Sequence, residues 1–226
     1  RLMKAQNRFV RWEWIKAKVK KNPGDFRPES YRVNIDSIAP LLRVDTKDGW
    51  AERLNWIEPN VIDGFRTLEE RRQKTGETMG FIRPKKISLV IQRSDEPDWD
   101  PIKKTALSKD SLLDPEEVKK RPPLRKLPYS FYYLYECNDE VGITHKHKIN
   151  DWEICQLYWN CEKKYGANWE KPFRHRVEDE FSTNKDLILM MGTMHRFPNE
   201  WLIIGVIYPP KVTARKLALF PNVPNV

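Results

Sequence analysis

The sequence lacks the residues and motifs that define several large classes of secreted protein and enzyme. Its 226 residues include three cysteines and nine glycines. Three cysteines without a CxxC pair do not make the disulfide framework of a small secreted domain, and they favour a reducing compartment. No GxSxG, GxGxxG or P-loop motif is present, so a nucleotide-driven enzyme is not expected.

Long hydrophobic runs are missing as well. The longest, around WLIIGVIYPP at 201–210, is too short to cross a bilayer, and no signal-peptide pattern opens the chain. We therefore expect a cytoplasmic protein without a membrane partner. The chain begins at Arg1 instead of Met, so we expect further residues upstream.

Positive charge is what the sequence has in excess. Lys and Arg number 41 against 32 Asp and Glu, which gives a net charge of +9. Such an excess favours a polyanionic partner, because Lys and Arg release counterions from phosphate backbones. Nucleic acid, either DNA or RNA, is the partner we expect. A basic protein with no such partner is the alternative.

The basic residues form three clusters beside extended or proline-rich chain, at residues 1–21, 83–86 and 119–126. Aromatic residues such as Trp12, Trp14 and Tyr31 lie among the basic residues and can stack on exposed bases. The alternative is that the aromatic residues belong to the core and the basic residues form a solvated face. No motif of a base-reading module is present, so we expect contacts to the phosphate backbone. The residues predicted to make them are Arg8, Arg11, Lys16, Lys18, Arg27, Arg32, Arg83, Lys85, Lys86, Arg121, Arg125 and Lys126.

The order of hydrophobic patterns predicts an α+β fold with a mixed or antiparallel sheet. Residues 1–93 combine short strands, expected to be β-barrel-like, with two helices, the second opening at a capping box of Thr67 and Glu70. Residues 94–128 are a polar, proline-punctuated connection. Residues 129–226 contain a strand, a pair of helices at 150–165 and 167–182, and a buried β-hairpin at 186–208. These parts form two halves or one compact unit.

The stretch GITHKHKINDWEI at 142–154 is a candidate metal site. Strand-like alternation places His145 and His147 on one face, and Asp151 follows directly after the strand. Imidazole and carboxylate groups suit Zn, Mn or Mg, so these three residues are predicted ligands if the chain folds back on itself. The alternative is that Asn150 caps a helix whose first turn contains Asp151 and Glu153.

His195 extends this candidate site into a catalytic hypothesis. It follows a buried strand, where a rigid sheet can hold a catalytic group. In a metal-dependent nuclease or related hydrolase, His195 would join the two histidines, Glu153 would act as general base or ligand, and Lys211 would stabilise developing phosphate charge. The alternative for His195 is a hydrogen-bonded turn histidine. The residues leave open whether the protein is a binding module or an enzyme.

Five segments resemble a family of uncharacterised prokaryotic proteins. The resemblance covers most of the chain and implies a bacterial or archaeal origin, but no activity. Relatives in this family have additional N-terminal residues and a further cysteine near the position of Gly142, so this sequence does not support a Cys/His zinc knot. The segments are FRPESYRVNIDSI, DGWAERLNWI, GFIRPKKI, DWEICQLYW and GTMHRFPNEWLIIGVIYPPK.

Overall fold

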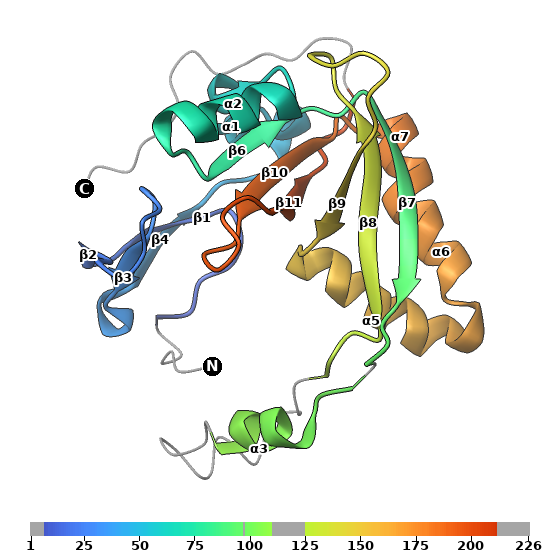
Figure 1. Cartoon of the computed structure of the whole chain (residues 1–226), viewed down its shortest axis with the longest axis horizontal. Coiled ribbons are helices and arrows are strands. Elements are labelled where there is room, and N and C mark those ends of the chain that lie inside the picture. The colour runs from blue at the N-terminus through green and yellow to red at the C-terminus, as the bar shows by residue number, and fades with distance from the viewer. Residues whose placement is uncertain (1–6, 97, 110–124, 212–226) are drawn as a thin grey trace.

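The predicted α+β class is confirmed by the computed structural model, which describes residues 7–96, 98–109 and 125–211 (Figure 1). Seven strands form one mixed sheet that is not closed into a barrel. None of the described helices is long and apolar enough to cross a membrane. In sheet order the strands are β5 (Val61–Ile62), β6 (Met79–Ile82), β10 (Ile188–Thr193), β11 (Trp201–Ile207), β9 (His145–Ile149), β8 (Tyr129–Glu136) and β7 (Lys86–Arg93).

The strands on either side of the connection at 94–128 are neighbours in this sheet. β7 and β8 pair antiparallel along their whole length, from Lys86 opposite Glu136 to Arg93 opposite Tyr129. The described part of the connection contains one helix, α3 (Pro101–Lys109). Residues before and after the connection therefore contribute to one hydrophobic core.

The predicted hairpin is confirmed as β10 and β11, which pair antiparallel in the middle of the sheet. A register shift between Met190 and Met191 places one extra residue in β11. β10 also pairs with β6, and β11 pairs in parallel with β9, so both are central strands. Their sequences are near-continuous apolar runs because one face packs in the main core and the other packs against a second hydrophobic cluster.

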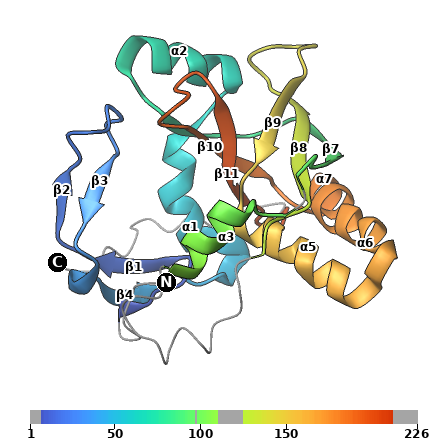
Figure 2. The same ribbon diagram turned by 60° about the horizontal axis from the view of Figure 1, so that its bottom comes forward.

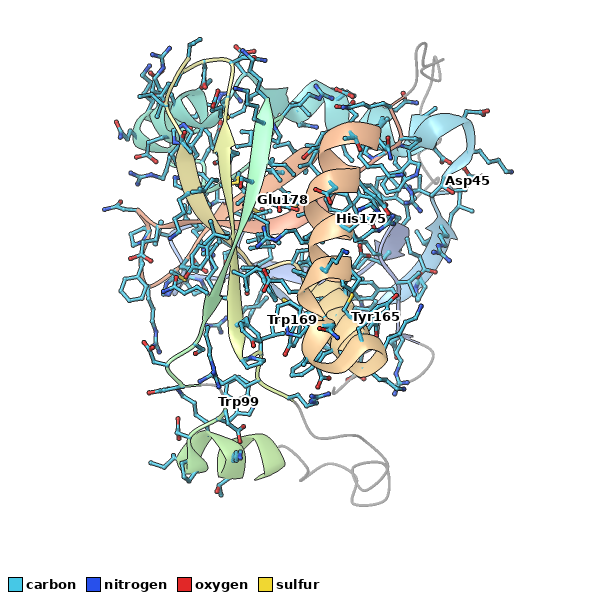
Figure 3. The ribbon with its side chains drawn as sticks, turned by 90° about the vertical axis from the view of Figure 1, so that its right-hand side faces the viewer. Asp45, Trp99, Tyr165, Trp169, His175 and Glu178 are labelled. Carbon is cyan, nitrogen blue, oxygen red and sulfur yellow. The ribbon has the colours of Figure 1, made fainter. Side chains whose placement is uncertain are left out.

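The helices α2 (Phe65–Thr75), α5 (Trp152–Tyr165), α6 (Glu170–Arg174) and α7 (Glu180–Asn184) contribute to the main core on one face of the sheet. A five-residue π-helical turn, His175–Asp179, makes α6 and α7 one continuous helical segment (Figure 3). Its buried stripe, predicted from the spacing, packs against Phe131 and Tyr133. The stripe is Trp169, Phe173, Val177 and Phe181.

The opposite face of the sheet is covered at one end by α1 (Lys47–Ile57). Leu54 and Ile57 are buried there against Ile188 and Ile207. A short 3-10 turn, Glu58–Asn60, then leads into β5. Over β9, β8 and β7, no described helix covers this outer face.

The N-terminal strands form two separate two-stranded ribbons, so the barrel-like expectation is wrong. One ribbon pairs β1 (Glu13–Lys16) with β4 (Ala39–Arg43), and the other pairs β2 (Val19–Lys21) with β3 (Tyr31–Val33). A 3-10 turn, Ile35–Ser37, joins β3 to β4. A barrel needs a continuous ladder around its wall, and these four strands contribute only two isolated ladders.

A buried arginine anchors the ribbons to α1. The Arg53 side chain lies 4.7 Å from the ring centroids of both Trp12 and Trp50, and its Nε and Nη2 donate to the Val44 carbonyl oxygen. Both tryptophans have positive φ, 67° and 70°, a region that bulky side chains rarely adopt. The cation–π contacts and the Trp12–Trp50 packing hold this strained backbone in place.

Candidate nucleic-acid interface

The two histidines of β9 share one face of the strand, as predicted, and that face points into the core. Phe65 packs against both rings, with centroid distances of 4.8 Å to His145 and 4.5 Å to His147. Tyr135 places its hydroxyl 2.9 Å from Nδ1 of His147. Burial and the neighbouring His145 lower the pKa of His147 to about 4, so its ring is neutral near pH 7.

Two carboxylates of the β8–β9 loop lie near these histidines, and only one of them contacts a histidine. Glu140 Oε2 lies 3.2 Å from His145 Nε2, an ion pair when the ring is protonated. Asp139 Oδ2 accepts from the backbone N–H and the hydroxyl of Thr67. The predicted capping box is therefore wrong. The helix begins at Phe65, and a carboxylate from the β8–β9 loop satisfies its first turn.

Asp151 is a structural residue and not a free metal ligand. Its side chain is 4% exposed, and Oδ1 accepts from the backbone N–H groups of Glu153 and Ile154. Oδ2 accepts from the N–H of Val206, at 2.9 Å, and lies 3.6 Å from Nη1 of Arg11. Asp151 is thus the N-cap of α5, one residue after the predicted cap, and both of its oxygens are occupied.

The three residues predicted to be catalytic lie against different partners. Glu153 accepts a 2.6 Å hydrogen bond from Arg11. His195 contacts the tip of the β2–β3 ribbon, with Nε2 3.1 Å from the Gly24 carbonyl oxygen, while Lys211 Nζ donates to the Ser182 carbonyl oxygen. Within 7–96, 98–109 and 125–211, no group of three or more His, Cys, Asp or Glu side chains is placed to hold a metal ion. Of the predicted metal ligands, His145 and His147 lie side by side, but Asp151 is held by other partners and does not join them.

Three of the predicted phosphate-binding arginines are already paired with carboxylates inside the molecule. Two of them also join the ribbons to the sheet, because Arg11 donates to the Val206 carbonyl oxygen and Arg27 donates to that of Thr193. These guanidinium groups hold the fold together and are not free for phosphate. The ion pairs are Arg11 with Asp151 and Glu153, Arg27 with Asp25, and Arg83 with Glu58 and Asp186.

The predicted clusters at 83–86 and 119–126 are also partly neutralised. Arg125 lies 3.6 Å from the ring centroid of Trp159 and 3.7 Å from Glu162. Lys85 is exposed, and Arg121 lies outside the described residues. The two remaining pairs are Lys86 with Glu136, at 3.7 Å, and Lys126 with Glu96, at 3.6 Å.

Several exposed cations without a carboxylate partner lie on or next to the N-terminal ribbons. Arg8, Lys16, Lys18 and Lys20 are exposed and form no ion pair within the described part of the chain. In the β2–β3 ribbon Lys20 stands directly opposite Arg32, whose Nε donates to the side-chain oxygen of Asn22. By alternation Lys18 lies on the same side of the ribbon. Figure 2 shows this ribbon to one side of the main sheet, and its tip contacts the end of β10 and the loop after it through Arg27 and Gly24.

The reverse side of the same ribbon is apolar and open. Val19 and Val33 pair across it and are 54% and 46% exposed. Tyr31 is 52% exposed, and Lys21 Nζ lies 5.1 Å from its ring centroid. The ribbon therefore has a cationic face and an apolar face, neither of them buried by the rest of the described chain.

Sequence reasoning missed three cations and one cavity. Lys20 continues the alternation of Lys16 and Lys18 in KAKVK, and Lys146 and Lys148 alternate with the histidines. This two-residue repeat of a strand could have identified all three lysines as lying on one exposed face of their strand.

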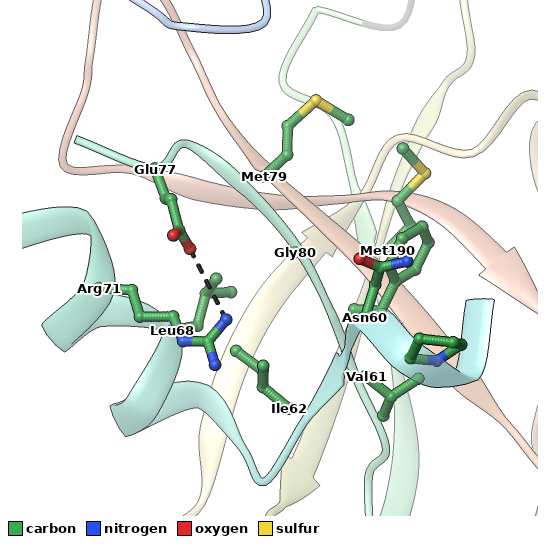
Figure 4. Close-up of a pocket in the computed structure, with 11 residues that line it drawn as sticks. Asn60, Val61, Ile62, Leu68, Arg71, Glu77, Met79, Gly80 and Met190 are labelled. Carbon is green, nitrogen blue, oxygen red and sulfur yellow. Dashed lines mark ion pairs between the residues drawn. The ribbon is translucent and has the colours of Figure 1, made fainter. Parts of the chain in front are cut away.

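A cavity of about 330 Å³ lies beside the edge of the sheet at β5 and β6 (Figure 4). Its walls come from separate segments, which local patterns cannot bring together. They include Val61, Ile62, Leu68, Met79, Phe81 and Met190, with the ion pair of Arg71 and Glu77 on one side.

The fold and the surface thus define an α+β protein in which cation-bearing ribbons are attached to one face of a mixed sheet. Residues 62–224 match the family model of DUF8757, a domain of unknown function, and residues 1–59 match DUF8758, a second domain of unknown function. The chain belongs to the DUF8757 family, in agreement with its resemblance to an uncharacterised family. No curated protein and no solved structure gives a significant match.

Proposed function

We propose that the protein binds nucleic acid through the phosphate backbone, with the cationic face of the β2–β3 ribbon as the main contact. The observation that carries this proposal is the pairing of Lys20 with Arg32 directly across the ribbon, next to Lys18. Like charges placed opposite each other in a sheet are destabilising. A phosphate lying on this face would replace that repulsion with attraction.

The form of the ribbon supports the same proposal. A two-stranded antiparallel ribbon fits the major groove of B-DNA, and several DNA-binding proteins use strands in this way. Tyr31, beside Lys21 on the reverse face of the ribbon, and Phe26 at its tip are 52% and 60% exposed, so single strands are also suitable ligands. Phosphate contacts fix position but do not read sequence, and the proposal extends to both DNA and RNA.

A metal-dependent hydrolase has less support. The three residues that it needs most face different partners. Asp151 is buried and uses both carboxylate oxygens, His147 is hydrogen-bonded to Tyr135, and His195 lies against the ribbon tip. A hydrolytic site needs these groups to converge on one ion, and each is held by other bonds.

The test is fluorescence anisotropy with labelled single-stranded and duplex oligonucleotides at about 50 to 200 mM salt. The variant Lys18→Gln/Lys20→Gln/Arg32→Gln removes three cations from the ribbon without changing its apolar face. Because each phosphate contact contributes about 0.9 (duplex) or 0.7 (single strand) to the salt slope, we expect the slope to fall by about 2 to 3.

The matched control is Lys163→Gln/Lys164→Gln/Lys171→Gln, which removes the same charge from exposed positions on α5 and α6. If binding depends only on net charge, both triple variants will lose the same affinity. That result, or a wild-type protein that binds neither oligonucleotide, contradicts the proposal.

A further inference from the structure

The outer face of β7, β8 and β9 carries partly buried apolar side chains that lie outside both hydrophobic clusters. Strand alternation turns Val90, Tyr132 and Leu134 outward, while their neighbours Leu89 and Tyr133 are buried on the other face. Neither hydrophobic cluster of the described chain includes the three outward residues. This part of the sheet is therefore an open platform.

Two lysines flank the aromatic ring on this platform. Lys148 stands directly across from Tyr132, and Lys146 stands across from Leu134. Lys146 Nζ lies 4.7 Å from the Tyr132 ring centroid, a cation–π contact that places a positive charge beside the ring. Both lysines are exposed and form no ion pair among the residues that the structure describes.

Acidic charge on this face is already neutralised. Glu136 is the carboxylate at the end of β8, and Lys86 lies 3.7 Å from it. Around Tyr132 the platform therefore carries net positive charge. An anionic, planar ligand is complementary to it in both charge and shape.

The platform lies on the same side of the sheet as the ribbons. Trp12 and Trp50 pack in the hydrophobic cluster of Ile188 and Ile207, which belongs to this outer face. The chain leading into β1 is thereby fixed over β10 and β11, and β9 is the next strand in the sheet. The platform and the β1 end of the N-terminal segment therefore lie on one side of the sheet.

We propose that this platform binds single-stranded nucleic acid, with a base stacked on Tyr132 and phosphates bound by Lys146 and Lys148. The inference rests on the proposed function and deepens it by naming the ligand form. Bases of a duplex are stacked inside the helix and cannot reach an aromatic ring on a flat sheet, whereas bases of a single strand can. Tyr132 accordingly discriminates single strands from duplexes, and the ribbon lysines do not.

The experiment compares labelled oligo(dT) with a DNA hairpin duplex. Tyr132→Leu keeps an apolar side chain on the platform but removes the ring, and it should weaken oligo(dT) binding about tenfold while duplex affinity stays within about twofold. Lys146→Gln/Lys148→Gln should lower the single-strand salt slope by about 1.4. In the wild type, photo-crosslinking of a 5-iodouracil oligonucleotide should label the peptide that contains Tyr132.

The control uses a similar pair elsewhere on the surface. Tyr165 is 42% exposed on α5, and Lys164 Nζ lies 5.1 Å from its ring centroid, so Tyr165→Leu tests whether any exposed tyrosine beside a lysine has this effect. Equal losses for Tyr132→Leu and Tyr165→Leu, or equal losses on single strand and duplex, overturn the inference.

The remaining outcomes separate the two proposals. If the ribbon triple variant loses binding and Tyr132→Leu does not, the platform inference fails and the proposed function stands. If the wild type binds neither probe, both fail. Loss with Tyr132→Leu on oligo(dT) but not on the duplex, together with loss of binding in the ribbon triple variant, supports both.

Discussion

Replacing Asp151 by asparagine separates a structural carboxylate from a metal ligand. One oxygen of Asp151 caps α5 and the other accepts from Val206. Asparagine caps helices as well as aspartate, so its single oxygen can retain the cap, but its NH₂ group cannot accept from Val206. A buried N–H left without a partner costs about 1–3 kcal/mol, and we expect Asp151→Asn to lower the unfolding free energy by about that amount.

Alanine at the same position removes both functions. The lost cap adds about 0.5–2 kcal/mol, so Asp151→Ala should cost about 1.5–5 kcal/mol in total. Urea unfolding followed by tryptophan fluorescence, with and without EDTA, measures both variants. Asp179→Asn, at a side chain that is 62% exposed, is the control and should stay within about 0.5 kcal/mol. Wild-type stability in Asp151→Asn, or an EDTA effect in the parent that the variant lacks, would refute the structural role.

Three further predictions follow from buried groups. Burial lowers the pKa of folded His147 to about 4, against about 6.5 when unfolded, so unfolding free energy should fall by up to about 3 kcal/mol as the pH drops from about 6.5 to 4. His147→Gln should flatten that pH dependence in urea titrations. A Cβ on Gly64 would lie 1.9 Å from Oδ1 of Asp139. Gly64→Ala should therefore lower the unfolding free energy by about 1–3 kcal/mol, which a lower urea midpoint would show. Burial raises the pKa of Cys137 and Cys155 to about 11, so iodoacetamide at about pH 8 should label them slowly in the folded protein and rapidly after unfolding. Rapid labelling of the folded protein would contradict the buried placement.

Strand and helix patterns were readable where one face is buried. The alternation of HKHKI correctly separated His145 and His147 from the lysines, and the four-residue spacing from Trp169 to Phe181 correctly marked the core side of a helix. These patterns are local, because a side chain's direction depends only on its position along its own strand or helix. The strands of the β2–β3 ribbon were harder to predict from the sequence. Neither face of this ribbon is buried, so its hydrophobic pattern carries little information about strand position.

The sequence by itself determined the α+β class, the central hairpin and the surplus of positive charge, because composition and residue period do not depend on how elements are arranged. Only the tertiary structure decided which charges remain free. Arg11 meets Asp151, 140 positions away in the chain, because the order of strands in the sheet brings them together, whereas Lys18 and Lys20 form no ion pair within the described part of the chain. The position of His195 against Gly24 has the same origin, since a contact between distant segments depends on long-range packing and not on the residues beside it.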